Sequence, residues 1–117
     1  MVCRLARRGD VKESYATLVE AVYLCDTPEG IAHVLINWNY HHGGCFLASI
    51  QTSPGETRKH GAARQALELE MPEMRRRGCK KVGFLATTSS EAFWRKVPFV
   101  KKMKGERWRY NIDLEEP

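Results

Sequence analysis

The stretch from residue 45 to residue 63 most constrains the fold, because it passes from strand-like to helix-like sequence across a single break. Residues 45–52 are mainly apolar and are typical of a strand. The Pro54-Gly55 pair ends that strand. Helical periodicity follows and stops at three arginines and Gly78, which suit the last turn of a helix and the position after it. The chain therefore has to mix strands with helices.

A further helix is predicted near the N-terminus. Val11, Tyr15, Leu18 and Val22 recur at helical spacing, so residues 11–24 favour an amphipathic helix. The other predicted elements are strands at residues 2–6, 31–38, 81–87, 99–103 and 108–114, and a short helix at residues 91–96. This order of elements favours an α/β or α+β fold in which helices flank a mixed sheet.

Length and composition indicate the class of protein. The chain has 117 residues, of which 43% are hydrophobic and 28% charged, so we expect one globular domain over residues 1–117. No apolar run is long enough to span a bilayer, and the first ten residues lack the apolar segment of a secretory leader. We therefore expect a cytoplasmic protein without a membrane partner, in which Cys3, Cys25, Cys45 and Cys79 are reduced thiols.

Charge is distributed unevenly along the chain. Residues 1–57 carry 4 basic and 6 acidic side chains, whereas residues 58–117 carry 15 basic and 8 acidic side chains. A basic half suits an anionic partner. The start of the helix after the Pro-Gly break is a candidate place for it, because free N–H groups and the helix dipole both favour an anion there. Arg58, Lys59 and Arg64 add positive charge, so this segment is predicted to hold a pyrophosphate, with an ordinary packed helix start as the alternative.

The segment after the Pro-Gly break resembles a signature of the GNAT superfamily of acyl-CoA N-acyltransferases. Arg58, Gly61 and Ala63 match its pattern Q/R-x-x-G-x-G/A, and Pro54 stands where the family has a V-x-P element. Residues 93–99 are similar to the aromatic segment of the family's last short helix. The resemblance implies a mixed, mostly antiparallel twisted sheet flanked by helices, in which two parallel central strands splay apart.

The resemblance also implies a site for acetyl-CoA. The signature segment would bind the pyrophosphate through backbone amides, and the pantetheine arm would lie between the strands at 45–52 and 81–87. The residues implied in cofactor binding are Ile50, Thr52, Arg58, Lys59, His60, Gly61, Ala62, Ala63, Arg64 and Phe93. A strand N–H would polarise the thioester carbonyl. A primary amine would then attack directly, without a metal and without a covalent enzyme intermediate.

The acid and the base of this reaction have to come from this chain's own residues. Trp94 stands where the family often has a tyrosine that protonates the leaving thiolate, and an indole N–H is not a useful acid. Tyr110 is the candidate acid, with a serine or water as alternatives. Glu56, beside the signature segment, is the candidate base. The further candidates for the base are His33, His41, His42 and Gln51.

The acceptor and the class of function keep several alternatives. The N-terminal part is shorter than in many relatives, so an open groove is expected to admit a small amine, a protein amine or a homodimer partner. Trp94 favours a catalytically degenerate sensor that binds acyl-CoA. A basic nucleic-acid-binding module would use Trp108 and Tyr110 among lysines and arginines, but no recognised motif supports it. The spacing of His41, His42 and Cys45 matches no compact zinc pattern.

Overall fold

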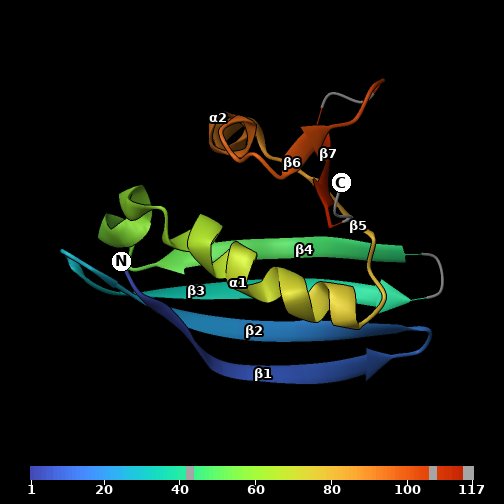
Figure 1. Cartoon of the computed structure of the whole chain (residues 1–117), viewed down its shortest axis with the longest axis horizontal. Coiled ribbons are helices and arrows are strands. Elements are labelled where there is room, and N and C mark those ends of the chain that lie inside the picture. Colours follow the sequence, from blue (N-terminus) through green and yellow to red (C-terminus); the bar gives the residue numbers. More distant parts are fainter. Residues whose placement is uncertain (42–43, 106–107, 115–117) are drawn as a thin grey trace.

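Seven strands form one mixed sheet in the part of the chain that the computed structural model describes, which is residues 1–41, 44–105 and 108–114. For Arg58 and Lys59 the description covers the backbone alone. The order across the sheet is β1-β2-β3-β4-β5-β7-β6 (Figure 1). The strands are β1 (Cys3–Glu13), β2 (Ala16–Thr27), β3 (Gly30–His41), β4 (Gly44–Ser53), β5 (Lys81–Leu85), β6 (Val100–Lys102) and β7 (Arg109–Asp113). The helices are α1 (Ala62–Arg76) and α2 (Glu91–Arg95), with short 3-10 turns η1 (Gly55–His60) and η2 (Thr88–Ser90).

The fold is rich in strands, and the expected α/β fold with a helix-flanked sheet is wrong. Residues 11–24, predicted as a helix, form the end of β1, a turn and most of β2. Val19 and Tyr23 alternate on the buried face of β2 with the two-residue period of a strand. Leu18 and Val22, whose helical spacing suggested the helix, lie on the opposite and partly exposed face. The sheet therefore lacks the helical layer that this segment was expected to supply.

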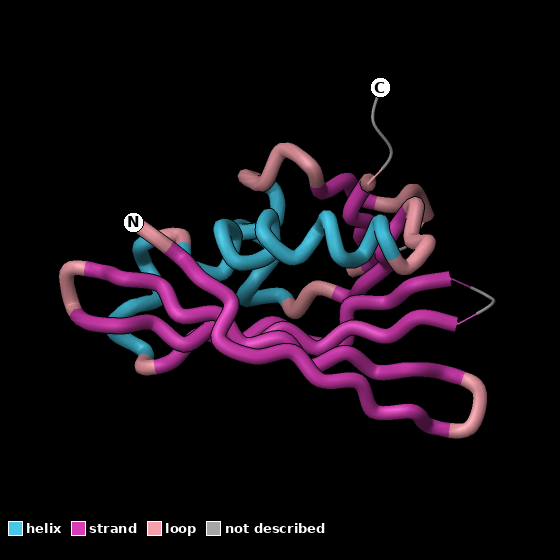
Figure 2. Tube along the Cα trace, turned by 60° about the horizontal axis from the view of Figure 1, so that its bottom comes forward, coloured by secondary structure: helices cyan, strands magenta, loops and turns pink. Residues whose placement is uncertain are grey.

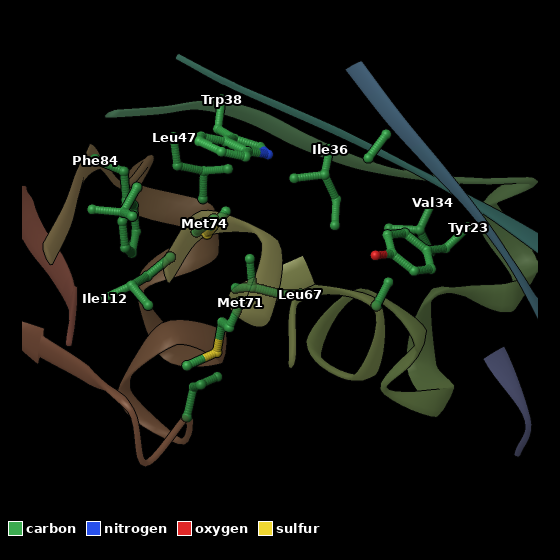
Figure 3. Packing of buried hydrophobic residues seen from close by; sticks show 14 of the residues in the cluster. Tyr23, Val34, Ile36, Trp38, Leu47, Leu67, Met71, Met74, Phe84 and Ile112 are labelled. Atoms are coloured by element: carbon green, nitrogen blue, oxygen red, sulfur yellow. The ribbon is translucent and has the colours of Figure 1, made fainter. Parts of the chain in front are cut away.

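α1 covers one face of β1–β4 (Figure 2). Leu67 and Met74 of α1 are fully buried against the alternating apolar side chains of β2 and β3 (Figure 3). Phe84 of β5 and Ile112 of β7 belong to the same cluster, so one core continues across β4 into the second part of the sheet. Pro72 is exposed within α1, and the helix continues past it to Arg76.

A buried carboxylate sets the position of α1 on the sheet. Glu70 is fully buried and accepts hydrogen bonds from the Tyr23 hydroxyl at 2.6 Å and from Trp38 Nε1 at 2.9 Å. The Arg8 guanidinium donates to both carboxylate oxygens, with Nε at 3.2 Å. Burial and the hydrogen bond to Glu70 raise the pKa of the Tyr23 hydroxyl, so it remains a donor at neutral pH. Side chains from β1, β2 and β3 thus meet on one residue of α1.

Removal of this shared acceptor should destabilise the protein. We expect Glu70→Ala to lower the free energy of unfolding by about 3 kcal/mol, because it leaves the charge of Arg8 without its partner. Urea denaturation followed by circular dichroism measures the change. Glu68→Ala is the matched control, since Glu68 forms an exposed pair with Arg64 on the same helix and should contribute less than about 1 kcal/mol. Equal losses in the two variants would contradict the role of Glu70.

Two disulfides stand in place of the four expected thiols, so that expectation is wrong. Cys3 lies opposite Cys25 in the register of β1 and β2, and the two are bonded. Cys45 at the start of β4 is bonded to Cys79, which lies between α1 and β5. The partners are 22 and 34 residues apart in sequence and become neighbours only in the folded chain. Disulfides are typical of oxidising compartments, and a cytoplasmic location stays a prediction.

Mass spectrometry tests the disulfides directly. We expect iodoacetamide to label no cysteine in the denatured, unreduced protein and all four cysteines after reduction. Proteolysis without reduction should give two linked peptides, one joining Cys3 to Cys25 and one joining Cys45 to Cys79. The double variant Cys45→Ala with Cys79→Ala is the control, in which the first linked peptide remains. Full labelling before reduction would refute both bonds.

None of the helices in the described residues is both long enough and apolar enough to cross a bilayer.

Candidate functional site

β4 and β5 run parallel but pair over a very short distance. Cys45 lies opposite Val82 and Phe46 opposite Gly83, and these are the paired positions in the described residues. Beyond them β4 continues along β3 as far as Ser53, whereas β5 continues along β7 (Figure 1). The two strands therefore diverge. Because peptide groups along a strand point alternately to its two edges, half of those in the later part of β4 face away from β3, toward the gap.

A groove of about 1020 Å³ lies where the two strands diverge. Its walls come from β2, β3, β4, β5, η2, α2 and the start of α1. Leu47, Phe84 and Trp94 supply apolar surface, and Ser49 and Ser89 supply hydroxyl groups. Ligand sites in proteins combine an apolar lining with a few polar groups in this way.

Four of the residues implied in cofactor binding lie together along this groove. Ile50 and Thr52 line it from β4, Ala63 lines it from α1, and Phe93 lines it from α2. Ile50 lies opposite Ile36 in the register of β3 and β4, and therefore on the same side of the sheet as the core. The groove thus joins the middle of β4 to the first turn of α1.

The start of α1 is the place where the sequence predicts an anion. Gly61 has φ of 78° in the left-handed region, and a Cβ added there would meet no atom within 4 Å. No side chain caps α1 in the described residues, and its first turn contains no acidic residue. Ala62 is fully buried, and Ala63 is the residue of this first turn that lines the groove. Outward N–H groups and the positive end of the helix dipole are the features that bind phosphate at helix starts.

Two of the basic residues expected around this helix start, His60 and Arg64, are not part of the groove wall. His60 and Arg64 lie beside a second hollow of about 300 Å³. His60 Nε2 contacts the carboxylate of Glu29, and Arg64 forms an exposed ion pair within α1. The backbone of Arg58 and Lys59 lies in η1, and their side chains are outside the described residues.

The residues predicted as acid and base do not line the groove. Tyr110 is 1% exposed, and its hydroxyl donates to Glu91 at 2.8 Å. Its ring stacks on Phe84 with 5.7 Å between the centroids, because β7 pairs with β5 and turns its inner face to the core. Glu56 is exposed on η1, away from the groove lining. Among the described residues, no contact of Tyr110 or Glu56 supports either role.

Two of the further candidates for the base do line the groove. His33 of β3 and Gln51 of β4 are part of its wall, whereas His41 lies at the other end of β3. His42 lies outside the described residues. The sequence did indicate which face of the sheet His33 occupies. Its neighbours Ala32 and Val34 are apolar and buried, so in a strand His33 points to the opposite face. What sequence could not supply is its distance from β5 and α2.

The metal and nucleic-acid alternatives gain no support from these contacts. Within the described residues no three histidine, cysteine or acidic side chains form a group that could hold a metal ion. Tyr110, which the nucleic-acid alternative uses for base stacking, is buried. The three arginines at the end of α1 all have partners within the chain. Arg75 Nε donates to the Leu114 carbonyl at 2.9 Å, and Arg76 and Arg77 pair with Glu73.

Comparison of the chain with models of protein families, with characterised proteins and with solved structures gives no match.

Proposed function

We propose that this protein is an acyl-CoA-dependent N-acyltransferase, which transfers an acetyl group from acetyl-CoA to a primary amine. The groove between the diverging strands β4 and β5, ending at the uncapped start of α1, is the observation that carries the proposal. The signature-like segment Arg58-x-x-Gly61-x-Ala63 occupies that helix start. Ala63 of that segment lines the groove, whereas Gly61 lines the neighbouring second hollow, and both support a ligand at this helix start.

The groove suits the shape and chemistry of coenzyme A. The pantetheine arm is a long chain with two amide groups, and the edge of β4 that faces the gap offers backbone donors and acceptors to it as a neighbouring strand would. The pyrophosphate would lie at the first turn of α1, where Gly61 leaves room for close approach to the backbone. Phe93 and Trp94 would cover the apolar part of the arm.

The chain's own residues favour direct transfer over a covalent enzyme intermediate. All four cysteines are in disulfides, so no thiolate is available as a nucleophile. A backbone N–H on the edge of β4 that faces the gap would donate to the thioester carbonyl oxygen, and charge that develops on that oxygen would be stabilised there. The amine nitrogen then forms the new C–N bond as the C–S bond breaks, and the electron pair leaves with the sulfur.

Binding and turnover measured together test the proposal. Calorimetry with coenzyme A and acetyl-CoA measures affinity, and thiol release with a panel of primary amines measures transfer. Binding with thiol release supports the enzyme. Binding without thiol release for any amine supports the acyl-CoA sensor, and salt-sensitive binding of oligonucleotides without coenzyme affinity supports the nucleic-acid module. Absence of coenzyme binding would refute the proposal.

Substitution of Gly61 provides a sharper test of the helix start. We expect Gly61→Ala to weaken coenzyme A binding about tenfold, because the added methyl group stands where the pyrophosphate approaches the backbone. Gly78→Ala is the matched control: Gly78 follows the other end of α1, has a φ of 97°, and also has open space at its Cβ position. Both variants carry similar backbone strain. Equal coenzyme affinities in the two variants would contradict a pyrophosphate site at Gly61.

A further inference from the structure

His33 differs from the other residues of the groove wall because it carries an imidazole. Among the described residues that line the groove, it is the one histidine, and no carboxylate, amine or thiol side chain lines the groove beside it. The other polar side chains in the lining are hydroxyls and the Gln51 amide. Histidine is also the side chain that most often transfers protons in enzymes.

The register of the sheet explains how His33 reaches the groove. His33 lies opposite Leu24 of β2 and Ser53 of β4, on the face away from α1. Ala32 and Val34, its neighbours in β3, are fully buried on the α1 face. The groove therefore connects two sides of the sheet, with Ala63 of α1 on one side and His33 on the other.

We infer that His33 is the general base that takes a proton from the acceptor amine, which enters from the sheet face opposite α1. The inference rests on the proposed function. A protonated amine, R–NH3⁺, gives one proton to His33 and becomes a nucleophile. Its nitrogen forms the C–N bond to the acyl carbon, the C–S bond breaks, and the sulfur leaves with the bonding electron pair. The nitrogen loses a second proton, which neutralises the thiolate, and His33 releases the first proton to water.

The surroundings of His33 indicate the class of amine. Val22 and Leu35 lie on the same face and are apolar parts of the groove wall. The charged side chains on this face of β1 and β2 are Arg4, Arg7, Glu13, Glu20 and Asp26, and Arg4 lies 3.6 Å from Asp26 in an exposed pair. In the second part of the sheet the charged side chains on this face are Lys81, Lys101, Arg109 and Asp113. None of these charged residues lines the groove. An amine with an apolar body therefore fits this wall better than a polycation.

Kinetics of His33→Gln test the role, with His41→Gln as the matched control from the other end of β3. The assay is thiol release with saturating acetyl-CoA and either 2-phenylethylamine or spermidine. At about pH 7 we expect His33→Gln to lower kcat/KM about 100-fold while the Kd for acetyl-CoA is unchanged. Near pH 10 the amine loses its proton without help, so the deficit should shrink to a few-fold. The wild type should prefer 2-phenylethylamine.

Each other outcome has a defined meaning. A wild-type rate in His33→Gln, or a deficit that is the same at both pH values, overturns the role of His33 and leaves the proposed function intact. Equal losses in His33→Gln and His41→Gln do the same, because they indicate an effect on folding. A preference for spermidine overturns the assignment of the acceptor class. A wild type that binds acetyl-CoA but acylates neither amine overturns the inference, and failure of the wider amine panel overturns the proposed function as well.

Discussion

The short parallel contact between β4 and β5 is the constraint on which the candidate site depends. Two residue pairs and the nearby bond from Cys45 to Cys79 hold the strands together at one end. Beyond that point β5 is paired with β7, and β4 is paired with β3. The divergence leaves one edge of β4 unpaired with β5 and makes room for the groove.

The second constraint is the position of α1. Glu70 ties the middle of the helix to three strands, and Arg77 near its end donates to the Tyr40 hydroxyl at 2.8 Å and pairs with Asp10. At its start, the Ala62 carbonyl lies 3.9 Å from Cys25 Sγ. The helix is therefore attached along its length, and its first turn is held beside the groove. A stable anion site needs such a fixed helix start, because backbone donors have to be aligned before the ligand arrives.

Local patterns explain which parts of the site were predictable. The strand-break-helix pattern at residues 45–63 correctly indicated that β4 leads into α1, and Ile50, Thr52, Ala63 and Phe93 do share one groove. The surroundings of the candidate acid and base could not be predicted from local patterns. Tyr110 alternates with apolar residues on a strand, but only the packing of β7 against β5 decides that its hydroxyl meets Glu91. Sequence gives no measure of that distance.

Sequence by itself determined the alternation of β3, the Pro-Gly break and the helical period of α1, because these depend on neighbours within a few residues. Tertiary structure decided the rest. Residues 11–24 contain both a helical and a strand-like spacing of apolar residues, and the strand prevails because it pairs with β1 and β3 while burying Val19, Ala21 and Tyr23 under α1. Both disulfides, the divergence of β4 from β5 and the place of His33 likewise depend on contacts between residues far apart in the chain.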